Sequence, residues 1–121
     1  MNIINNDSEK IGTVIYSLGN FISAQNERYR DSGIIAKVNL TINKTNPEET
    51  KVNSIEYTPV YVDRNPNSSG KNYRVVDVNK AIQEYENNLD NLISQNEYNE
   101  LIFARDYYRN KLLQDNFVLE K

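Results

Sequence analysis

The pattern of apolar and polar residues predicts a long β-hairpin in the middle of the chain. Between residues 33 and 42, apolar side chains occupy every second position, which is the period of a strand with one buried face. The residues predicted to face the core are Ile34, Ala36, Val38, Leu40 and Ile42. Residues 52–62 are rich in β-branched and aromatic side chains, so they predict the returning strand, with Tyr57 and Tyr61 near the same core.

Proline, asparagine and glycine mark the ends of these strands. Residues 44–50 contain Asn46-Pro47 and predict the loop of the hairpin, and residues 63–72 predict a second loop because they hold an Asn-Pro-Asn-Ser-Ser-Gly run. Pro59 lies inside the returning strand. Because proline cannot donate a backbone hydrogen bond, we expect this part of the strand at a sheet edge or a bulge.

Two further strands are predicted on either side of the hairpin. Residues 11–18 form an apolar run without strict alternation, which is typical of a strand covered on both faces. Gly19-Asn20 follows it as a turn signal. Residues 73–78 predict a last short strand.

From Asn79 onwards the apolar spacing becomes helical. One stripe contains Ile82, Tyr85, Leu89 and Leu92, with Ala81 and Ile93 beside them. Asp77 or Asn79 is expected to cap this helix. A second helix is predicted over residues 96–114, with a stripe of Tyr98, Leu101, Ile102, Tyr108 and Leu112. Ser94 and Glu97 have the spacing of a capping box, although a single unbroken helix is the competing interpretation.

These elements predict an α+β fold, in which a small antiparallel sheet of about four strands precedes a C-terminal pair of helices. At roughly 100–200 residues per domain, residues 1–121 form one domain. Residues 1–78 are its β-rich part and residues 79–121 its helical tail.

Composition removes much of the usual chemistry of active sites. The chain has no Cys and no His, so thiolate nucleophiles, imidazole bases and the commonest transition-metal ligands are excluded. A metal would need oxygen ligands, and Asn46, Glu48, Glu49 and Asp63 lack the regular spacing of a calcium loop. The net charge of −3 argues against nucleic-acid binding.

Basic and aromatic residues in the second predicted helix could suggest a nucleic-acid-binding surface. They are Arg105, Tyr107, Tyr108, Arg109 and Lys111. Acidic residues interrupt them, so we interpret them as a solvated helix face. No stretch reaches the roughly 20 consecutive apolar residues that would span a membrane, and we expect no membrane contact by this segment.

One short motif follows the first predicted strand. It consists of Tyr16, Ser17, Leu18, Gly19, Asn20 and Phe21. This string resembles a signature near the C-terminal end of the CapA family, bacterial proteins of poly-gamma-glutamate capsule biosynthesis with a calcineurin-like metallophosphoesterase fold. The resemblance continues through Gln25, the strand start at Ser32-Gly33-Ile34 and the string Tyr57-Thr58-Pro59-Val60-Tyr61. It covers about residues 8–78, and the helical tail matches nothing we can name.

The resemblance implies that this chain is the C-terminal portion of a larger protein of the cell envelope. In the family, Asp, Asn and His residues hold a divalent dimetal site, and the segments that carry them would lie upstream of Met1. The parent would be a metal-dependent, phosphatase-like enzyme or synthesis factor. This chain would have no catalytic residue, metal ligand or cofactor, its partner would be the remainder of the parent, and in isolation it would form a homodimer.

Two interpretations of the motif and of the chain stay open at this point. Gly19-Asn20 is favoured as a structural turn, while Ser17 or Asn20 would line the parent's site if the strand end lies near the metal. The chain itself is either this non-catalytic portion or a stand-alone interaction module. In the second case the helical tail would bind the partner.

Overall fold

The computed structural model describes residues 18–19, 31–63, 73–89, 92–113 and 118–121 of the chain. The elements in chain order are β1 (Ser32–Thr41), the short 3-10 helix η1 (Pro47–Glu49), β2 (Lys51–Asp63), β3 (Arg74–Asp77), α1 (Val78–Glu86), α2 (Gln95–Leu112) and β4 (Val118–Glu120). The predicted α+β class, a four-stranded and mainly antiparallel sheet with two helices near the C-terminus, is confirmed. The predicted strand at residues 11–18 lies outside the described residues except for Leu18.

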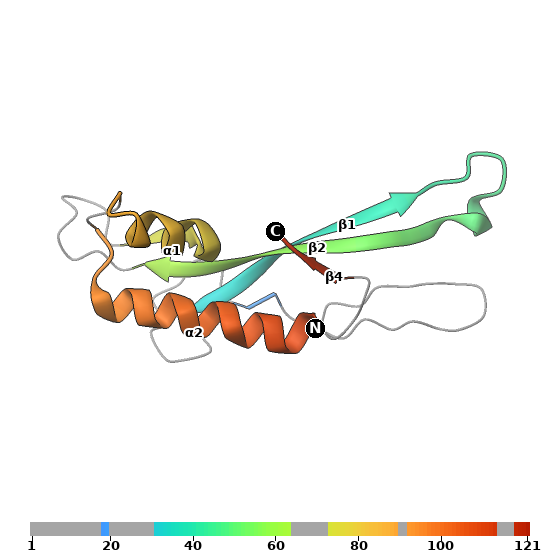
Figure 1. Ribbon diagram of the computed structural model, residues 1–121. Helices are drawn as coiled ribbons and strands as arrows, with labels where there is room; N and C mark the ends of the chain where they lie inside the picture. Colours follow the sequence, from blue (N-terminus) through green and yellow to red (C-terminus); the bar gives the residue numbers. More distant parts are fainter. Residues whose placement is uncertain (1–17, 20–30, 64–72, 90–91, 114–117) are drawn as a thin grey trace.

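β1 and β2 form the predicted hairpin, which is the longest feature of the molecule. The strands pair antiparallel from Ser32 opposite Tyr61 to Thr41 opposite Lys51. The register shifts at Leu40, because β2 has one extra residue there, Asn53. Figure 1 shows that the far end of the hairpin, with η1 at its tip, extends well beyond both helices.

β2 is the central strand of the sheet. β1 pairs along one side of it, and on the other side β3 pairs antiparallel with Val60–Asp63 while β4 pairs parallel with Ile55–Tyr57. β4 was not predicted from the sequence. A three-residue strand carries too little periodicity to stand out from a loop.

Pro59 therefore does not lie in an edge strand, and the register bulge is elsewhere. Val62 N donates to Asp31 O on the β1 side, so residues of opposite parity on β2, including Pro59, face β3 and β4. β4 ends opposite Tyr57 and β3 ends opposite Val60, so neither strand pairs with Pro59. The missing N–H thus falls in the gap between two partner strands, where it breaks no hydrogen bond of either ladder.

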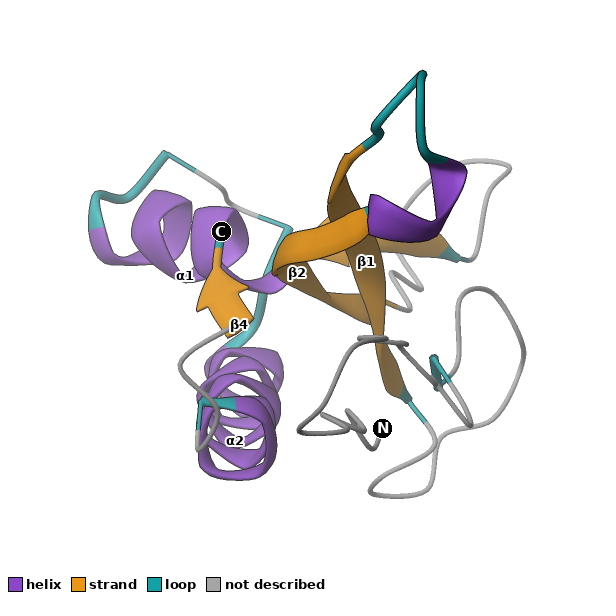
Figure 2. Ribbon diagram, turned by 90° about the vertical axis from the view of Figure 1, so that its right-hand side faces the viewer, coloured by secondary structure: helices purple, strands orange, loops and turns teal. Residues whose placement is uncertain are grey.

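Both helices lie on one side of the hairpin (Figure 2). Asp77 caps α1 by accepting a hydrogen bond from Lys80 N at 3.0 Å. The helix ends at Glu86, and Asn88 then takes a positive φ of 55°, which reverses the chain. The capping box of Ser94 and Glu97 begins α2, so the two-helix prediction is confirmed and the single long helix is wrong.

The core lies between the helices and the inner half of the hairpin. One buried cluster joins Tyr61 to both helices and contains Val78, Ala81, Ile82, Ile93, Leu101 and Ala104. A second cluster joins the middle of the hairpin to the end of α2 and to β4 through Ile34, Tyr57, Leu112 and Val118. Tyr57 and Tyr61 are buried as predicted.

The predicted row of core residues is wrong along its outer half. Ile34 is buried and Ala36 is half-buried, but the exposed fractions of Val38, Leu40 and Ile42 are 38%, 52% and 68%. The alternation continues past the end of α2, where the described residues include no element to cover it.

Two residues of the predicted helical stripe are not part of the core. Leu89 and Leu92 are exposed, because α1 ends at Glu86 before the helical spacing could turn them inward.

Candidate functional site

Two residues of the predicted signature are described, and they lie against the start of β1. Ile34 N donates to Leu18 O at 2.7 Å, and Gly19 forms an antiparallel bridge with Gly33. Leu18 and Gly19 therefore lie next to Ser32-Gly33-Ile34 at the start of β1. The other signature residues, Tyr16, Ser17, Asn20 and Phe21, lie outside the described residues, and so does their predicted role in lining a site.

Gly19 occupies a position that only glycine fits. Its φ is 80°, a left-handed conformation that L side chains rarely adopt. A Cβ atom there would lie 2.7 Å from Ser32 O and 2.8 Å from Gly33 Cα, both of them backbone atoms. The glycine is therefore explained by close packing against β1, which supports a structural role for this position.

Ser32 and Tyr108 lie beside this glycine and connect β1 to α2. Ser32 Oγ and Tyr108 Oη are 3.4 Å apart, and Ser32 is buried. Burial raises the pKa of Tyr108, so the phenol cannot accept a proton from serine near neutral pH. The pair is a structural hydrogen bond between sheet and helix, and it is not an activated nucleophile.

A second polar cluster lies where β2 ends. Asp63 is 1% exposed and stands opposite Arg74 in the β2–β3 ladder, where Arg74 Nε donates to Asp63 Oδ2. Glu97, in the first turn of α2, accepts hydrogen bonds from Ser94 N and Ser94 Oγ at 2.7 Å each. The capping box was predicted, but its contact with Asp63 was not, because that contact depends on how α2 packs against the end of β2.

The two carboxyl groups of this cluster have opposite pKa shifts. Burial and a side-chain hydrogen bond with Glu97 raise the pKa of Asp63 to about 6, against the lowering effect of Arg74. Burial also acts to raise the pKa of Glu97, but hydrogen bonds from Ser94 and Asp63 outweigh it and lower that pKa. A carboxyl that titrates near pH 6 could act as an acid or base, yet Asp63 is too buried to touch a substrate.

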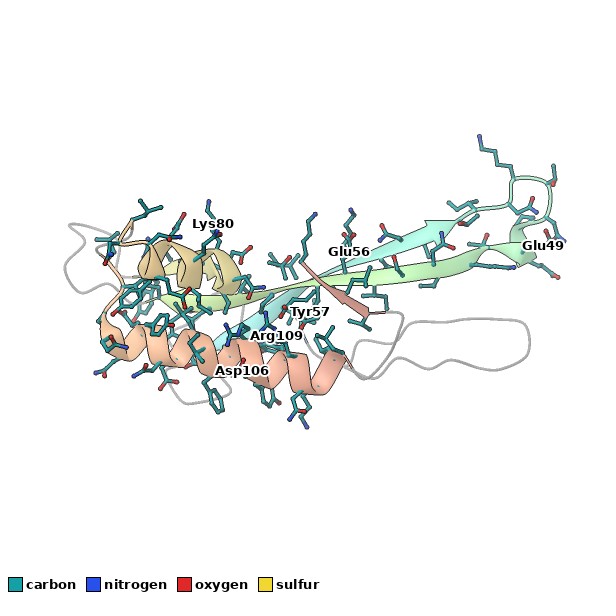
Figure 3. The ribbon with its side chains drawn as sticks, viewed as in Figure 1. Glu49, Glu56, Tyr57, Lys80, Asp106 and Arg109 are labelled. Atoms are coloured by element: carbon teal, nitrogen blue, oxygen red, sulfur yellow. The ribbon has the colours of Figure 1, made fainter. Side chains whose placement is uncertain are left out.

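A third cluster holds the C-terminal strand in place, and Figure 3 shows two of its members, Tyr57 and Arg109, close together. Tyr57 Oη donates to Glu120 Oε1 at 3.1 Å, and Arg109 Nε donates to Glu120 Oε2 at 2.8 Å. Burial and the neighbouring Glu120 carboxylate raise the pKa of Tyr57. β4 is thus fastened to both β2 and α2.

The basic residues of α2 are occupied by partners from the same chain. Arg105 Nε lies 2.9 Å from Asp106 Oδ1, Arg109 pairs with Glu120, and Lys111 Nζ lies 5.9 Å from the centre of the Tyr107 ring. These contacts support the interpretation of a solvated helix face.

The acidic residues considered for calcium are not brought together. Glu48 and Glu49 lie in η1 at the tip of the hairpin, whereas Asp63 lies at the other end of the 13-residue strand β2. Within the described parts of the chain, no three acidic side chains are grouped closely enough to hold a metal ion.

Comparisons of the chain with protein-family models, with curated proteins and with solved structures each found no match. Among the described residues, neither helix combines the length and the apolar character needed to cross a membrane.

Proposed function

We propose that this chain is the non-catalytic C-terminal portion of a CapA-like protein of capsule or poly-gamma-glutamate biosynthesis. In this proposal the chain supplies the last strands of the parent's sheet and covers them with its own helices. The divalent dimetal site of the parent, and the ligands that hold it, lie outside the chain. A location in the cell envelope follows from the same resemblance.

The observation that supports this proposal is the position of the segments that carry the resemblance. They are separated by up to about 40 residues in sequence, yet Gly19 pairs with Gly33, and Gly33 pairs in turn with Val60. Gly19 of the signature, the start of β1 and the string from Tyr57 to Tyr61 therefore lie side by side.

Activity and metal binding test the proposal. We expect the reading frame to extend upstream of Met1, and the longer product to bind manganese and hydrolyse a phosphodiester. The 121-residue chain alone is expected to do neither, because it has no His or Cys and groups no three acidic side chains among its described residues. Phosphodiesterase assays with added manganese, and metal analysis after dialysis, measure both products.

Two results would contradict this proposal. Stoichiometric manganese, iron or zinc on the short chain would show that it holds its own metal site. A stop codon immediately upstream of Met1 would exclude the longer parent and leave the stand-alone module.

The exposed outer half of the hairpin favours a second candidate function, that of an interaction module. Val38 and Leu40 lie on the same face of β1 as the buried Ile34, and both are exposed. The helical stripe, by contrast, is largely used inside the core, since Ile82 and Leu101 are buried. The hairpin face, continuous with the core, is therefore the surface through which the isolated chain would form a homodimer.

Light scattering tests self-association directly. We expect a mass near twice 14.1 kDa at micromolar concentration, and a mass near 14.1 kDa for Leu40→Glu, which places a charge on the hairpin face. Leu89→Glu is the matched control, because Leu89 is exposed on the turn after α1, and it should leave the dimer intact. A clean wild-type monomer across the micromolar range would contradict the dimer.

A further inference from the structure

We propose that Asp63 and Glu97 share one proton and form a pH-sensitive latch between the sheet and α2. The latch joins the end of β2 to the first turn of the helix. It is closed when the proton is present and weakened when the proton leaves. The device is independent of the parent protein's chemistry, because it depends only on residues of this chain.

The surroundings of Asp63 favour its protonated form. Asp63 Oδ2 accepts from Arg74, whereas Asp63 Oδ1 is inaccessible to solvent and has no hydrogen-bond partner when the group is treated as a carboxylate. A buried carboxylate oxygen without a donor is costly. If Asp63 carries the proton, it donates to Glu97 and this cost disappears.

Glu97 is the member that keeps its charge. It lies in the first turn of α2, where the backbone N–H groups favour an anion, and it already accepts two hydrogen bonds from Ser94. Asp63 lacks that support and is more deeply buried. The shared proton therefore belongs chiefly to Asp63, which agrees with the opposite pKa shifts of the two groups.

Several other charged groups lie near Asp63 and Glu97. Arg74 from β3 and Glu97 from α2 act on Asp63 directly. Asp31, just before β1, and Glu100 of α2 act on the neighbouring Tyr61 ring, and α1 packs against that ring through apolar side chains. Arg74 acts on both carboxyl groups, and once the proton is lost the two carboxylates repel each other.

The direction of the pH dependence follows from the raised pKa of Asp63. Its contribution to stability is complete below the unfolded value of 3.8 and is lost as the pH rises through about 6. The lowered pKa of Glu97 acts only at lower pH, where stability falls as the pH drops below 4.5. The chain has no His, so no imidazole titrates between pH 5 and 8.

Urea unfolding between pH 5 and 8 tests the latch. For the wild-type chain we expect the unfolding equilibrium constant to rise roughly tenfold across this range, from the two pKa values of Asp63. Asp63→Asn keeps the shape of the side chain and offers an N–H donor to Glu97 at every pH, so its unfolding constant should barely change. Asp106→Asn, on the exposed face of α2, should keep the wild-type rise.

Carbon-detected NMR of the side-chain carboxyl groups tests the wild-type chain without any variant. The Asp63 carboxyl carbon is expected to titrate with a midpoint near pH 6. A midpoint below pH 4.5, or a wild-type unfolding profile as flat as that of Asp63→Asn, would overturn the proposal. Loss of the rise in Asp106→Asn would also overturn it, because the response would then come from another carboxylate.

Discussion

Replacing Ile34 with aspartate is expected to unfold the protein, whereas the same change at Ile42 is expected to leave it folded. Both residues belong to the row of alternating apolar positions that the sequence assigns to one buried face. Ile34 is only 5% exposed and packs in the cluster with Tyr57 and Leu112, while Ile42 is exposed beyond the end of β1.

Two effects lower the stability of Ile34→Asp: the loss of a buried apolar side chain and the burial of an unpaired charge. Removing a buried isoleucine costs about 1.5–3 kcal/mol, and leaving an unpaired charge in its place costs about 3–5 kcal/mol. Their sum is about 4.5–8 kcal/mol, which is comparable with the whole stability of a domain in the lower half of the typical 5–15 kcal/mol. At Ile42 the charge stays in water, so a change within about 0.5 kcal/mol is expected.

Circular dichroism and urea unfolding distinguish these outcomes. Ile34→Asp should show no cooperative transition at 25 °C, and Ile42→Asp should unfold at the wild-type midpoint. If Ile34→Asp melted like the wild type, the cluster around Tyr57 would not be the core. If Ile42→Asp were strongly destabilised, the tip of the hairpin would be covered.

Shortening Leu101 to alanine is expected to give the second-largest effect. Leu101 of α2 is fully buried in the cluster that joins α1 and α2 to Tyr61, so shortening it leaves a cavity there. Leu→Ala changes in such positions cost about 2–5 kcal/mol. Leu89→Ala is the matched control, because Leu89 is 75% exposed and the same atoms are removed.

Thermal unfolding measures this pair of variants. For a domain of this size, a loss of about 3 kcal/mol corresponds to a fall in Tm of roughly 10 °C or more. Leu89→Ala should stay within about 2 °C of the wild type, in line with surface substitutions. Equal shifts in the two variants would mean that the two-helix arrangement is wrong.

The sheet and the helical tail bury each other's apolar side chains. The buried side chains of β1 and β2 contact Leu101 and Leu112 of α2, and β4 is fastened by Arg109 and Tyr57. For the proposed parent protein, this means that the last strands carry their own cover. The same arrangement places the Asp63–Glu97 latch at the junction of the two parts.

The sequence by itself determined most of the elements, because their signals are local. The two-residue period of β1, the Asp77 cap and the Ser94–Glu97 capping box each act within a few residues and needed no distant contact. The buried positions of Tyr57 and Tyr61 were also predicted, since both belong to the apolar and aromatic return strand.

The tertiary structure alone decided which of the alternating residues are buried and how the polar groups meet. Periodicity tells which side of a strand is apolar, but not how far the covering helix reaches, so Val38 and Ile42 were assigned to a core that ends before them. Likewise, Asp63 and Glu97 are 34 residues apart, and only the packing of α2 against the end of β2 brings them together. Which side chains are buried, and which polar groups contact each other, depends on contacts between segments that are distant in sequence. A local sequence pattern does not contain this information.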